Sequence, residues 1–269
     1  MSAESLFPAM PATISATLNY LAPTARPTIY SAGPGAPERR VGDHVDPRSM
    51  FLADARPVAG SFSIDREGFR LIEHHSTIRD YCDGVRSVFV REAEAIFQRE
   101  TGATRVVVFD PARRTSASDA QGDARPVLRV HNDFSDVSAQ RIVRELLPQD
   151  ADVLLRNEFA IVQLWQPIRP IESYPLAIAD SRTVAESELI VVKRCYPNWE
   201  GESHLVVYGS RHTWYWVPRM QPAEALIFKG YDSRQDGRAR WGVHTSFEHA
   251  SDTDVPRLSI EVRALAFFS

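Results

Sequence analysis

The C-terminal half of the chain is a succession of short strand-like segments, and this pattern limits the possible fold more than any other feature. Residues with high strand propensity alternate there with turn residues, as in antiparallel sandwiches and barrels. The segments span residues 159–168, 188–197, 203–210, 212–218, 224–233, 241–248 and 257–268. The sequence contains no internal repeat and no Gly-rich phosphate loop. We therefore expect a mainly β fold with flanking helices, built on a double-stranded β-helix of the jelly-roll, cupin-like type.

Helices and an N-terminal arm are expected around this barrel. Apolar residues at helical spacing predict one helix within residues 76–103 and a second within 136–155. Residues 104–110 are interpreted as a buried strand that ends at Asp110–Pro111. Residues 1–60, rich in Pro, Ala and Arg, are interpreted as an arm with a few short strands. The prediction is one domain, residues 1–269, whose jelly-roll core starts at about residue 105.

Charge and composition argue against several classes of partner. The formal net charge of -4 provides no electrostatic case for nucleic acid or an anionic membrane. No apolar run approaches the roughly 20 residues that span a bilayer, and residues 1–15 do not match a secretory signal. The two cysteines, Cys82 and Cys195, have no metal-like spacing. We expect a cytoplasmic protein that acts on a small molecule; the sequence leaves its oligomeric state open.

A histidine and an aspartate lie one residue apart where a strand-like run ends. Residues 127–130, VLRV, are followed by His131, Asn132 and Asp133. Alternate residues of a strand project from the same face, roughly 7 Å apart. His131 and Asp133 can therefore bind one metal ion while Asn132 points away. With a distant histidine they would form the two-His-one-carboxylate triad, which covers one face of Fe(II) and leaves three positions open.

Sequence context separates this pair from other histidines. His44 and Asp46 repeat the spacing, but they lie in a charged, proline-terminated loop ahead of any expected barrel strand. Three histidines are interpreted as surface or structural residues: His204, His212 and His249. His244 differs because it shares a strand face with Gly242 and Ser246, whose small size leaves room around a bound group. His244 is therefore the expected third ligand.

The last predicted strand has one apolar face and one polar face. The polar positions are Arg257, Ser259, Glu261 and Arg263. An edge strand with a solvated face is one interpretation. In the other, Arg257 and Ser259 lie in the barrel mouth beside His244, where a guanidinium fork and a hydroxyl would bind the distal carboxylate of 2-oxoglutarate. Glu261 and Arg263 would then form a buried pair below the cosubstrate.

These residues belong to longer tracts that resemble a known family. The tracts, which run in order from about Asp65 to Phe268, are DREGFRL, REAEAIFQRETGA, VVVFD, VHNDFS, YPLAIADSRTV, HTWYWVPRMQPAEALIFKGYDS, VHTSFE and PRLSIEVRALAFF. In this order they resemble the AsaB/CmcJ-like hydroxylase/desaturase family, relatives of the Fe(II)/2-oxoglutarate-dependent oxygenases. The resemblance covers roughly three quarters of the chain.

The resemblance implies an activity as well as a fold. It places Fe(II) on His131, Asp133 and His244, and 2-oxoglutarate on Arg257 with Ser259, with O₂ as the second cosubstrate. The implied reaction is hydroxylation, desaturation or cyclisation of a small natural-product or amino-acid-like substrate. Which of these reactions occurs, and on which substrate, stays open.

Two positions depart from the family pattern. QLWQPI, residues 163–168, stands where N-x-W-R-P-L is expected, and Pro111 stands where the family usually has histidine. Gln163 is nevertheless a candidate for cofactor binding and Trp165 for substrate binding. The departures bear on the details of cosubstrate and substrate binding, and hence on the reaction.

Substrate contacts and rival functions stay open. Arg240 shares strand parity with His244 and, with Arg238, is a candidate for binding an anionic substrate; the alternative is a solvated basic loop. The aromatic segment 214–216 is interpreted as core packing. Two other functions are considered: a cupin-like isomerase or Zn²⁺ hydrolase that does not use 2-oxoglutarate, and a non-catalytic jelly-roll binding module.

Overall fold

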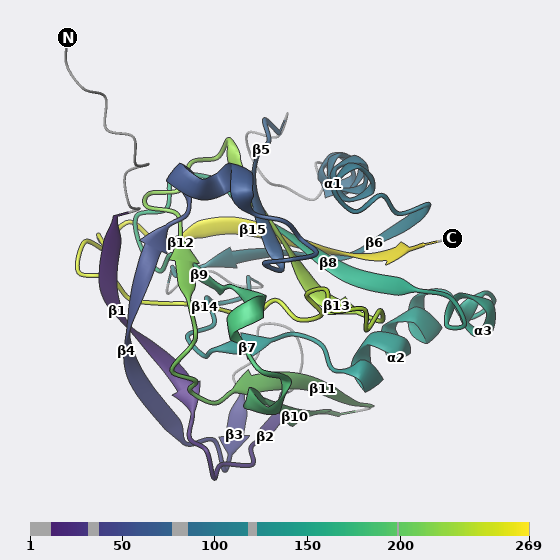
Figure 1. The fold of residues 1–269 in the computed structure, drawn as a ribbon, viewed down its shortest axis with the longest axis horizontal. Helices are drawn as coiled ribbons and strands as arrows, with labels where there is room; N and C mark the ends of the chain where they lie inside the picture. Colours follow the sequence, from purple (N-terminus) through teal and green to yellow (C-terminus); the bar gives the residue numbers. More distant parts are fainter. Residues whose placement is uncertain (1–11, 32–37, 77–85, 118–122, 198, 269) are drawn as a thin grey trace.

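Two β-sheets form the body of the protein (Figure 1). The structure, a computed structural model, describes residues 12–31, 38–76, 86–117, 123–197 and 199–268. Within these residues the smaller sheet has the order β5 (Phe69–Glu73), β13 (Glu224–Asp232), β8 (Phe159–Pro167), β15 (Leu258–Phe267) and β6 (Arg105–Thr115). The larger has the order β1 (Thr13–Leu21), β4 (Val45–Asp54), β12 (Trp214–Trp216), β9 (Leu176–Ala179), β14 (His244–Ser246), β7 (His131–Asn132), β11 (Trp199–Val206), β10 (Leu189–Tyr196), β2 (Thr28–Tyr30) and β3 (Arg39–Val41).

Alternation along β8 and β15 separates two environments. One face packs on α1 (Arg86–Thr101) through Val162, Leu164, Ile260 and Val262. On the other face Trp165 packs with Ile178 of the larger sheet, so this face points between the sheets. Ser259, Glu261 and Arg263 share it and are buried. The edge-strand interpretation of β15 is therefore wrong, because β15 lies between β8 and β6.

The helices differ from the predicted spans for local reasons. α1 ends at Thr101, where Gly102 has a positive φ of 69° and stops the helix; residues 77–85 of the predicted span lie outside the described residues. The second predicted helix is two, α2 (Asp136–Leu146) and α3 (Ala151–Leu154). Pro148 lies between them and has no N–H for a helical hydrogen bond. Ser135 caps α2 with a reciprocal Ser138 contact.

The N-terminal strands pair with strands that are distant in the sequence. β1 pairs with β4, and β4 pairs in parallel with β12. β2 pairs in parallel with β10. The first strands thus extend both ends of the larger sheet, a long-range arrangement that local patterns do not reveal. The division of the chain into an arm and a core stays a prediction.

Several strands have other bounds than expected. β6 does not end at Asp110–Pro111; it continues to Thr115 through a shift in its register with β15. Of the segment that ends in the His-Asp pair, only His131–Asn132 is a strand. The expectation for residues 214–216 is met at Trp214 and Trp216, which are buried in the core. The predominance of strands with flanking helices confirms the predicted fold class.

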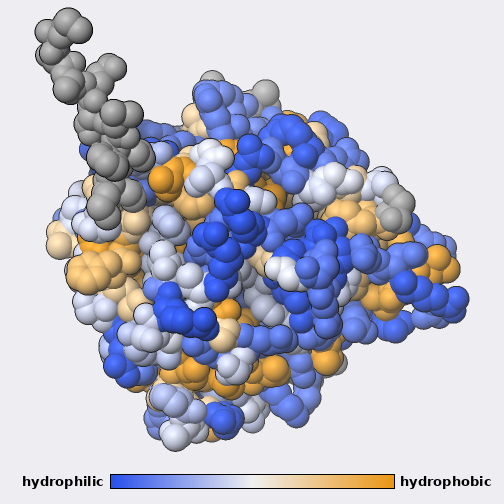
Figure 2. Space-filling view, viewed as in Figure 1, coloured by the Kyte–Doolittle hydropathy of each residue, from blue (hydrophilic) through white to orange (hydrophobic). Residues whose placement is uncertain are grey.

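The face in Figure 2 is mainly hydrophilic, and its hydrophobic side chains lie in separate areas. Among the described helices, none combines the length and the apolar character needed to cross a membrane.

Candidate metal centre and cosubstrate site

Three predicted ligands come together at adjacent strands of the larger sheet. β7 pairs with β14, and His131 lies directly opposite His244. One ligand atom from each of His131, Asp133 and His244 lies within 4.8 Å of the others. His131 Nε2 is 3.5 Å from Asp133 Oδ1, and the two imidazole centroids are 4.2 Å apart. Within the described residues, this is the one such cluster of His, Cys, Asp or Glu.

Backbone contacts orient both imidazole rings. His131 Nδ1 lies 2.7 Å from the Arg129 carbonyl oxygen, and His244 Nδ1 lies 2.9 Å from the Gly242 carbonyl oxygen. A carbonyl oxygen only accepts, so both Nδ1 atoms carry the proton and both Nε2 atoms keep a free lone pair. Burial, with the neighbouring His131, lowers the pKa of His244 to about 4. His244 is therefore neutral at physiological pH, as a metal ligand must be.

The ligand-bearing strands are fixed from behind by Asn132. Its side chain points away from the cluster, as expected, and its Oδ1 accepts a hydrogen bond from the Gly242 N–H at 3.2 Å. Its Nδ2 donates to the Phe134 carbonyl at 2.8 Å. At Gly242 a Cβ atom would lie 2.1 Å from the Lys229 carbonyl oxygen, so only glycine fits. The hydrogen bond between Gly242 and Asn132 therefore holds the residues just before β14 against β7.

Asp133 is a charged carboxylate in this setting. Arg263 Nη2 donates to its Oδ2 at 3.0 Å. Burial alone raises the pKa of Asp133, but Arg263, His131 and His244 outweigh that effect and hold the pKa well below its usual range. Two imidazole nitrogens and one carboxylate oxygen are the donor set of non-haem Fe(II) sites with open positions. The residues present therefore fit Fe(II).

Arg257 is a buried cation whose side chain has only uncharged hydrogen-bond partners among the described residues. Its side chain is 1% exposed, and no carboxylate of the described residues lies within 4.0 Å of its guanidinium. Its hydrogen bonds go to uncharged acceptors: the Ser259 hydroxyl at 3.1 Å, the Ser246 hydroxyl at 2.5 Å and the Tyr174 carbonyl at 2.9 Å. Burial, together with Arg114, lowers the pKa of Arg257 to about 9. A buried unpaired charge is costly, so the site fits an anionic ligand.

Ser246 connects this cation to the predicted ligand His244, and Trp165 lies beside the cation. Ser246 lies two residues after His244 on β14, so one short strand supplies a ligand and an Arg257 contact. The Arg257 guanidinium lies 4.9 Å from the Trp165 ring centroid. The sequence singled out Ser246 only for its small size. The Tyr174 contact is made by the backbone and has no sequence signal.

Gln163 and Trp165 face the same interior with unused donors. The Gln163 Oε1 accepts from Arg263 Nε at 3.2 Å. Its Nε2 and the Trp165 Nε1 are buried and have no hydrogen-bond partner among the described residues. Buried donors without partners are uncommon in folded proteins. Both atoms are thus available to a bound molecule.

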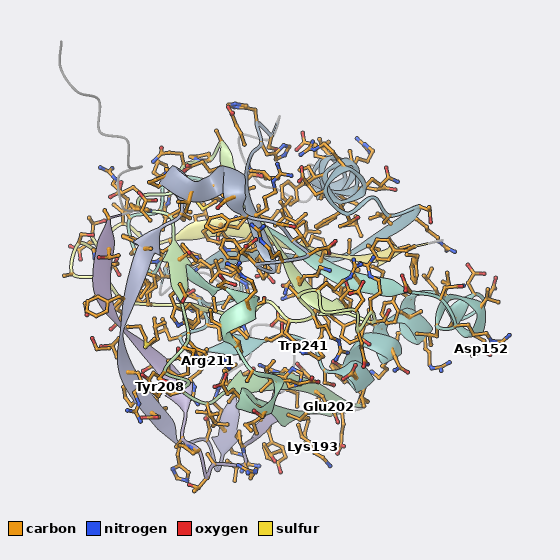
Figure 3. The ribbon with its side chains drawn as sticks, in the orientation of Figure 1. Asp152, Lys193, Glu202, Tyr208, Arg211 and Trp241 are labelled. Carbon is orange, nitrogen blue, oxygen red and sulfur yellow. The ribbon has the colours of Figure 1, made fainter. Side chains whose placement is uncertain are left out.

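Arg240 and Arg238 are not brought to this cluster by any described contact. Arg240 pairs with Asp136 at 2.7 Å, and Arg238 pairs with Asp236 at 2.6 Å and Asp65 at 3.1 Å. Their predicted role in substrate binding stays a prediction. Figure 3 labels the neighbouring Trp241. Its ring packs against His204, with the ring centroids 4.9 Å apart.

The other histidines serve as structural residues or lie at the surface. His212 bridges the Tyr20 hydroxyl at 3.0 Å and the Glu188 carboxylate at 2.9 Å. His204 is buried, and its pKa is lowered by burial to about 4. His44 is exposed, and His249 packs on Trp216. Cys195 is a free thiol, and Cys82 lies outside the described residues.

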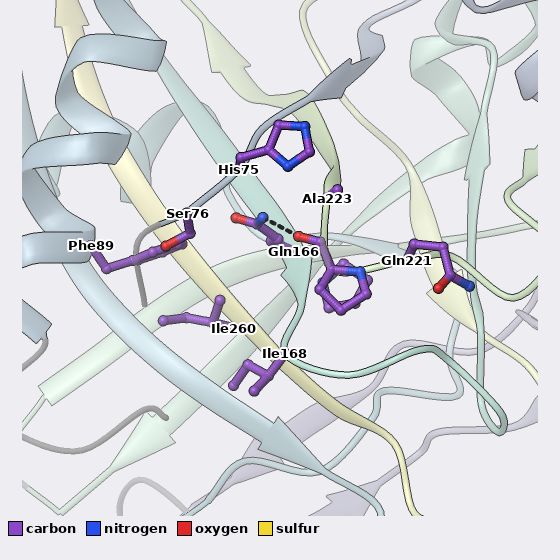
Figure 4. Close-up of a pocket in the computed structure, with 10 residues that line it drawn as sticks. His75, Ser76, Phe89, Gln166, Ile168, Gln221, Ala223 and Ile260 are labelled. Carbon is purple, nitrogen blue, oxygen red and sulfur yellow. Dashed lines mark hydrogen bonds between the residues drawn. The ribbon is translucent and has the colours of Figure 1, made fainter. Parts of the chain in front are cut away.

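A cavity of about 290 Å³ lies on the opposite face of the smaller sheet (Figure 4). Its lining includes Ile260 and Gln166, whose chain neighbours Ser259, Glu261 and Trp165 point the other way, between the sheets. The cavity is therefore separated from the metal cluster by the sheet itself.

Known proteins match this chain over most of its length. The family model described as an oxidoreductase/YMDC permease-like domain matches residues 18–267. The hydroxylase/desaturase asaB of Aspergillus flavus is 34% identical over 83% of this chain and 82% of the relative. The hydroxylase/desaturase efuI of Hormonema carpetanum is 29% identical over 95% of both chains. The solved structure of the iron and alpha-ketoglutarate-dependent endoperoxidase NvfI superposes with a TM-score of 0.84 at 26% identity, covering 96% of this chain and 98% of that chain.

These matches decide between the functions considered. They confirm the family resemblance and the jelly-roll fold, and they favour neither a cupin-like enzyme without 2-oxoglutarate nor a non-catalytic binding module. Alpha-ketoglutarate is 2-oxoglutarate, the cosubstrate expected at Arg257. The chain belongs to the AsaB-like hydroxylase/desaturase family of dioxygenases, which use Fe(II), 2-oxoglutarate and O₂.

Proposed function

We propose that His131, Asp133 and His244 hold the catalytic Fe(II), and that Arg257 with Ser259 binds the distal carboxylate of 2-oxoglutarate. The observation that carries this proposal is the buried Arg257, which has three uncharged hydrogen-bond partners and no described carboxylate partner. Bound Fe(II) with 2-oxoglutarate and O₂ supplies the oxidising chemistry. The protein's own residues bind the ion and the cosubstrate, orient them and shield them from water.

Each residue has a distinct part in this scheme. The carbonyls of Arg129 and Gly242 hold the two imidazoles so that their Nε2 atoms face the ion. The indole of Trp165 lies beside the Arg257 guanidinium and keeps water from it. Gln163 Nε2 is a spare donor for the cosubstrate or the substrate.

The proposed substrate is a small natural product or an amino-acid-like molecule. The family resemblance implies this substrate class, and the reaction type is supported by two relatives named hydroxylase/desaturase and a structural neighbour named endoperoxidase. Those names describe different reactions of one type of oxidising site. The position of the bound substrate therefore determines whether hydroxylation, desaturation, epoxidation or cyclisation occurs. Arg240, Arg238 and Trp165 stay candidates for that placement.

Three sequence-based expectations complete the proposal. The chain forms one oxygenase domain over residues 1–269, it acts in the cytoplasm, and it has no nucleic-acid or membrane partner. A mildly negative net charge of -4 supports the absence of a polyanionic partner.

The test is turnover of 2-oxoglutarate by the full-length protein. Purified protein is loaded anaerobically with Fe(II), 2-oxoglutarate and O₂ are added, and succinate is measured with and without candidate substrates. Wild type should release succinate, His244→Ala should release none above background, and His249→Ala, a matched histidine outside the cluster, should behave as wild type. Equal succinate release from His244→Ala and wild type would contradict the proposed site.

A further inference from the structure

Arg263 joins the two sheets next to the candidate metal centre. It lies on β15 of the smaller sheet, and its buried Nη2 donates to Asp133 Oδ2 at 3.0 Å, just past β7 of the larger sheet. The same Nη2 atom also donates to Glu261 on its own strand. One guanidinium nitrogen therefore bridges a proposed metal ligand and a second buried carboxylate.

The Arg263 guanidinium is fixed on its other sides. Its Nε donates to Gln163 Oε1 on β8 at 3.2 Å, and its Nη1 donates to Asp110 Oδ2 on β6 at 2.5 Å. Glu261 is itself held by Arg114, whose Nε donates to it at 2.6 Å. Turning the guanidinium away from Asp133 would break several charge-assisted hydrogen bonds at once.

The β6 strand is bent where it reaches Arg263. Phe109 pairs with Arg263 and Ala112 pairs with Glu261, so Asp110 and Pro111 together oppose Val262 alone. This is a β-bulge, a position where a strand tolerates proline and where a side chain is re-aimed. Asp110 has a φ of 48°, a left-handed conformation that is uncommon for a residue with a side chain. The bulge holds its carboxylate against the Arg263 guanidinium.

Arg263 leaves Asp133 with one free oxygen. Oδ2 is occupied by the Arg263 hydrogen bond, while Oδ1 faces His131 Nε2 at 3.5 Å. Without Arg263, Asp133 could rotate or offer both oxygens, and the charges of Asp133 and Glu261 would repel each other without a bridge. We propose that Arg263 is a positioning residue that presents Asp133 Oδ1 alone to the ion. The inference rests on the proposed metal site and names a residue that the triad does not include.

The test measures metal binding in the absence of 2-oxoglutarate. Full-length wild type, Arg263→Gln, Arg263→Lys and His244→Ala are titrated with Fe(II) anaerobically and with Co(II), whose visible absorption spectrum reports the number and arrangement of its ligands. The matched control is Arg56→Gln, which removes an arginine paired with Glu224 at 2.6 Å and leaves the contacts of Arg263 and the three ligands in place.

Arg263→Gln should weaken binding of both ions by about 10- to 100-fold, as changes behind a metal ligand do, and should alter the Co(II) spectrum. Arg263→Lys should restore part of the affinity, because it keeps the charge but not the planar fork. Arg56→Gln should bind within about threefold of wild type with an unchanged spectrum, since its pair with Glu224 involves neither Arg263 nor the ligands.

Failure of the metal site and failure of this inference give different results. If wild type binds no ion, or binds it equally after His244→Ala, the proposed site is wrong. If wild type binds and His244→Ala does not, while Arg263→Gln and Arg263→Lys keep affinity and spectrum, the positioning role is overturned. A lowered melting temperature with unchanged metal binding would also overturn it, since Arg263 would then serve stability alone. If Arg263→Gln does not fold, the metal affinity and the Co(II) spectrum of Arg263→Lys test the positioning role instead.

Discussion

Replacement of Arg257 by glutamine tests the cosubstrate site most directly. A guanidinium fork makes two charge-assisted hydrogen bonds to a carboxylate, at about 1.5–3 kcal/mol each, and a glutamine amide recovers about 1 kcal/mol. The net loss is about 2–5 kcal/mol, which corresponds to about 30- to 5,000-fold weaker binding of 2-oxoglutarate. Fe(II) affinity should stay within about threefold, because none of the described contacts of Arg257 involves His131, Asp133 or His244.

The assay is an anaerobic titration of the Fe(II)-loaded protein with 2-oxoglutarate, followed by the weak visible charge-transfer band that the chelated cosubstrate produces. Arg56→Gln is the matched control. The Arg56 guanidinium lies 2.6 Å from the Glu224 carboxylate, and this pair does not involve the metal cluster. Wild type and Arg56→Gln should titrate alike. An Arg257→Gln variant that is folded, binds Fe(II) and still titrates within about threefold of wild type would refute the carboxylate role, since the loss should be at least about 30-fold.

The remaining predictions concern neighbouring and structural groups. Ser246→Ala removes one hydroxyl contact of Arg257 and should weaken 2-oxoglutarate by about 3- to 10-fold in the same titration. The pKa of His204 is about 4, below its ordinary 6.5, so the unfolded chain binds the proton more readily. Stability should therefore fall as pH drops from about 6.5 to about 4, by up to about 3 kcal/mol, and His204→Phe should flatten that dependence in urea unfolding. Tyr20→Phe leaves His212 Nδ1 and an indole N–H without their partner and should cost about 1–3 kcal/mol in the same assay, with Fe(II) affinity unchanged.

Much of the candidate site could be predicted from short-range sequence patterns. The one-residue spacing of His131 and Asp133 and the small neighbours of His244 follow from strand periodicity, and the structure brings the three together. The polar face of the last strand was also evident from alternation. Whether that face met solvent or the interior depended on β6 covering the strand edge, which is a long-range pairing.

Other features depended on contacts that local sequence does not encode. Proline at position 111 suggested the end of a strand, but the bulge removes the need for its N–H and lets β6 continue. The contact between Arg263 and Asp133 joins different sheets, whereas the sequence pairs Arg263 most simply with its strand neighbour Glu261. Arg240 has the strand parity of His244, but Asp136 at the start of α2 binds it.

The strands that carry the proposed ligands are very short. β7 has two residues and β14 has three, and their mutual register consists of the single pair His131 and His244. An ion held by both would cross-link chain segments far apart in sequence. Pairing of β7 with β14 and binding of the ion would therefore stabilise each other. Amide exchange at β7 and β14 should therefore slow as the ion saturates its site, while exchange within the long β8 and β15 strands should hardly change. The two short strands that carry His131 and His244 should therefore report, through their amide exchange, whether iron is bound.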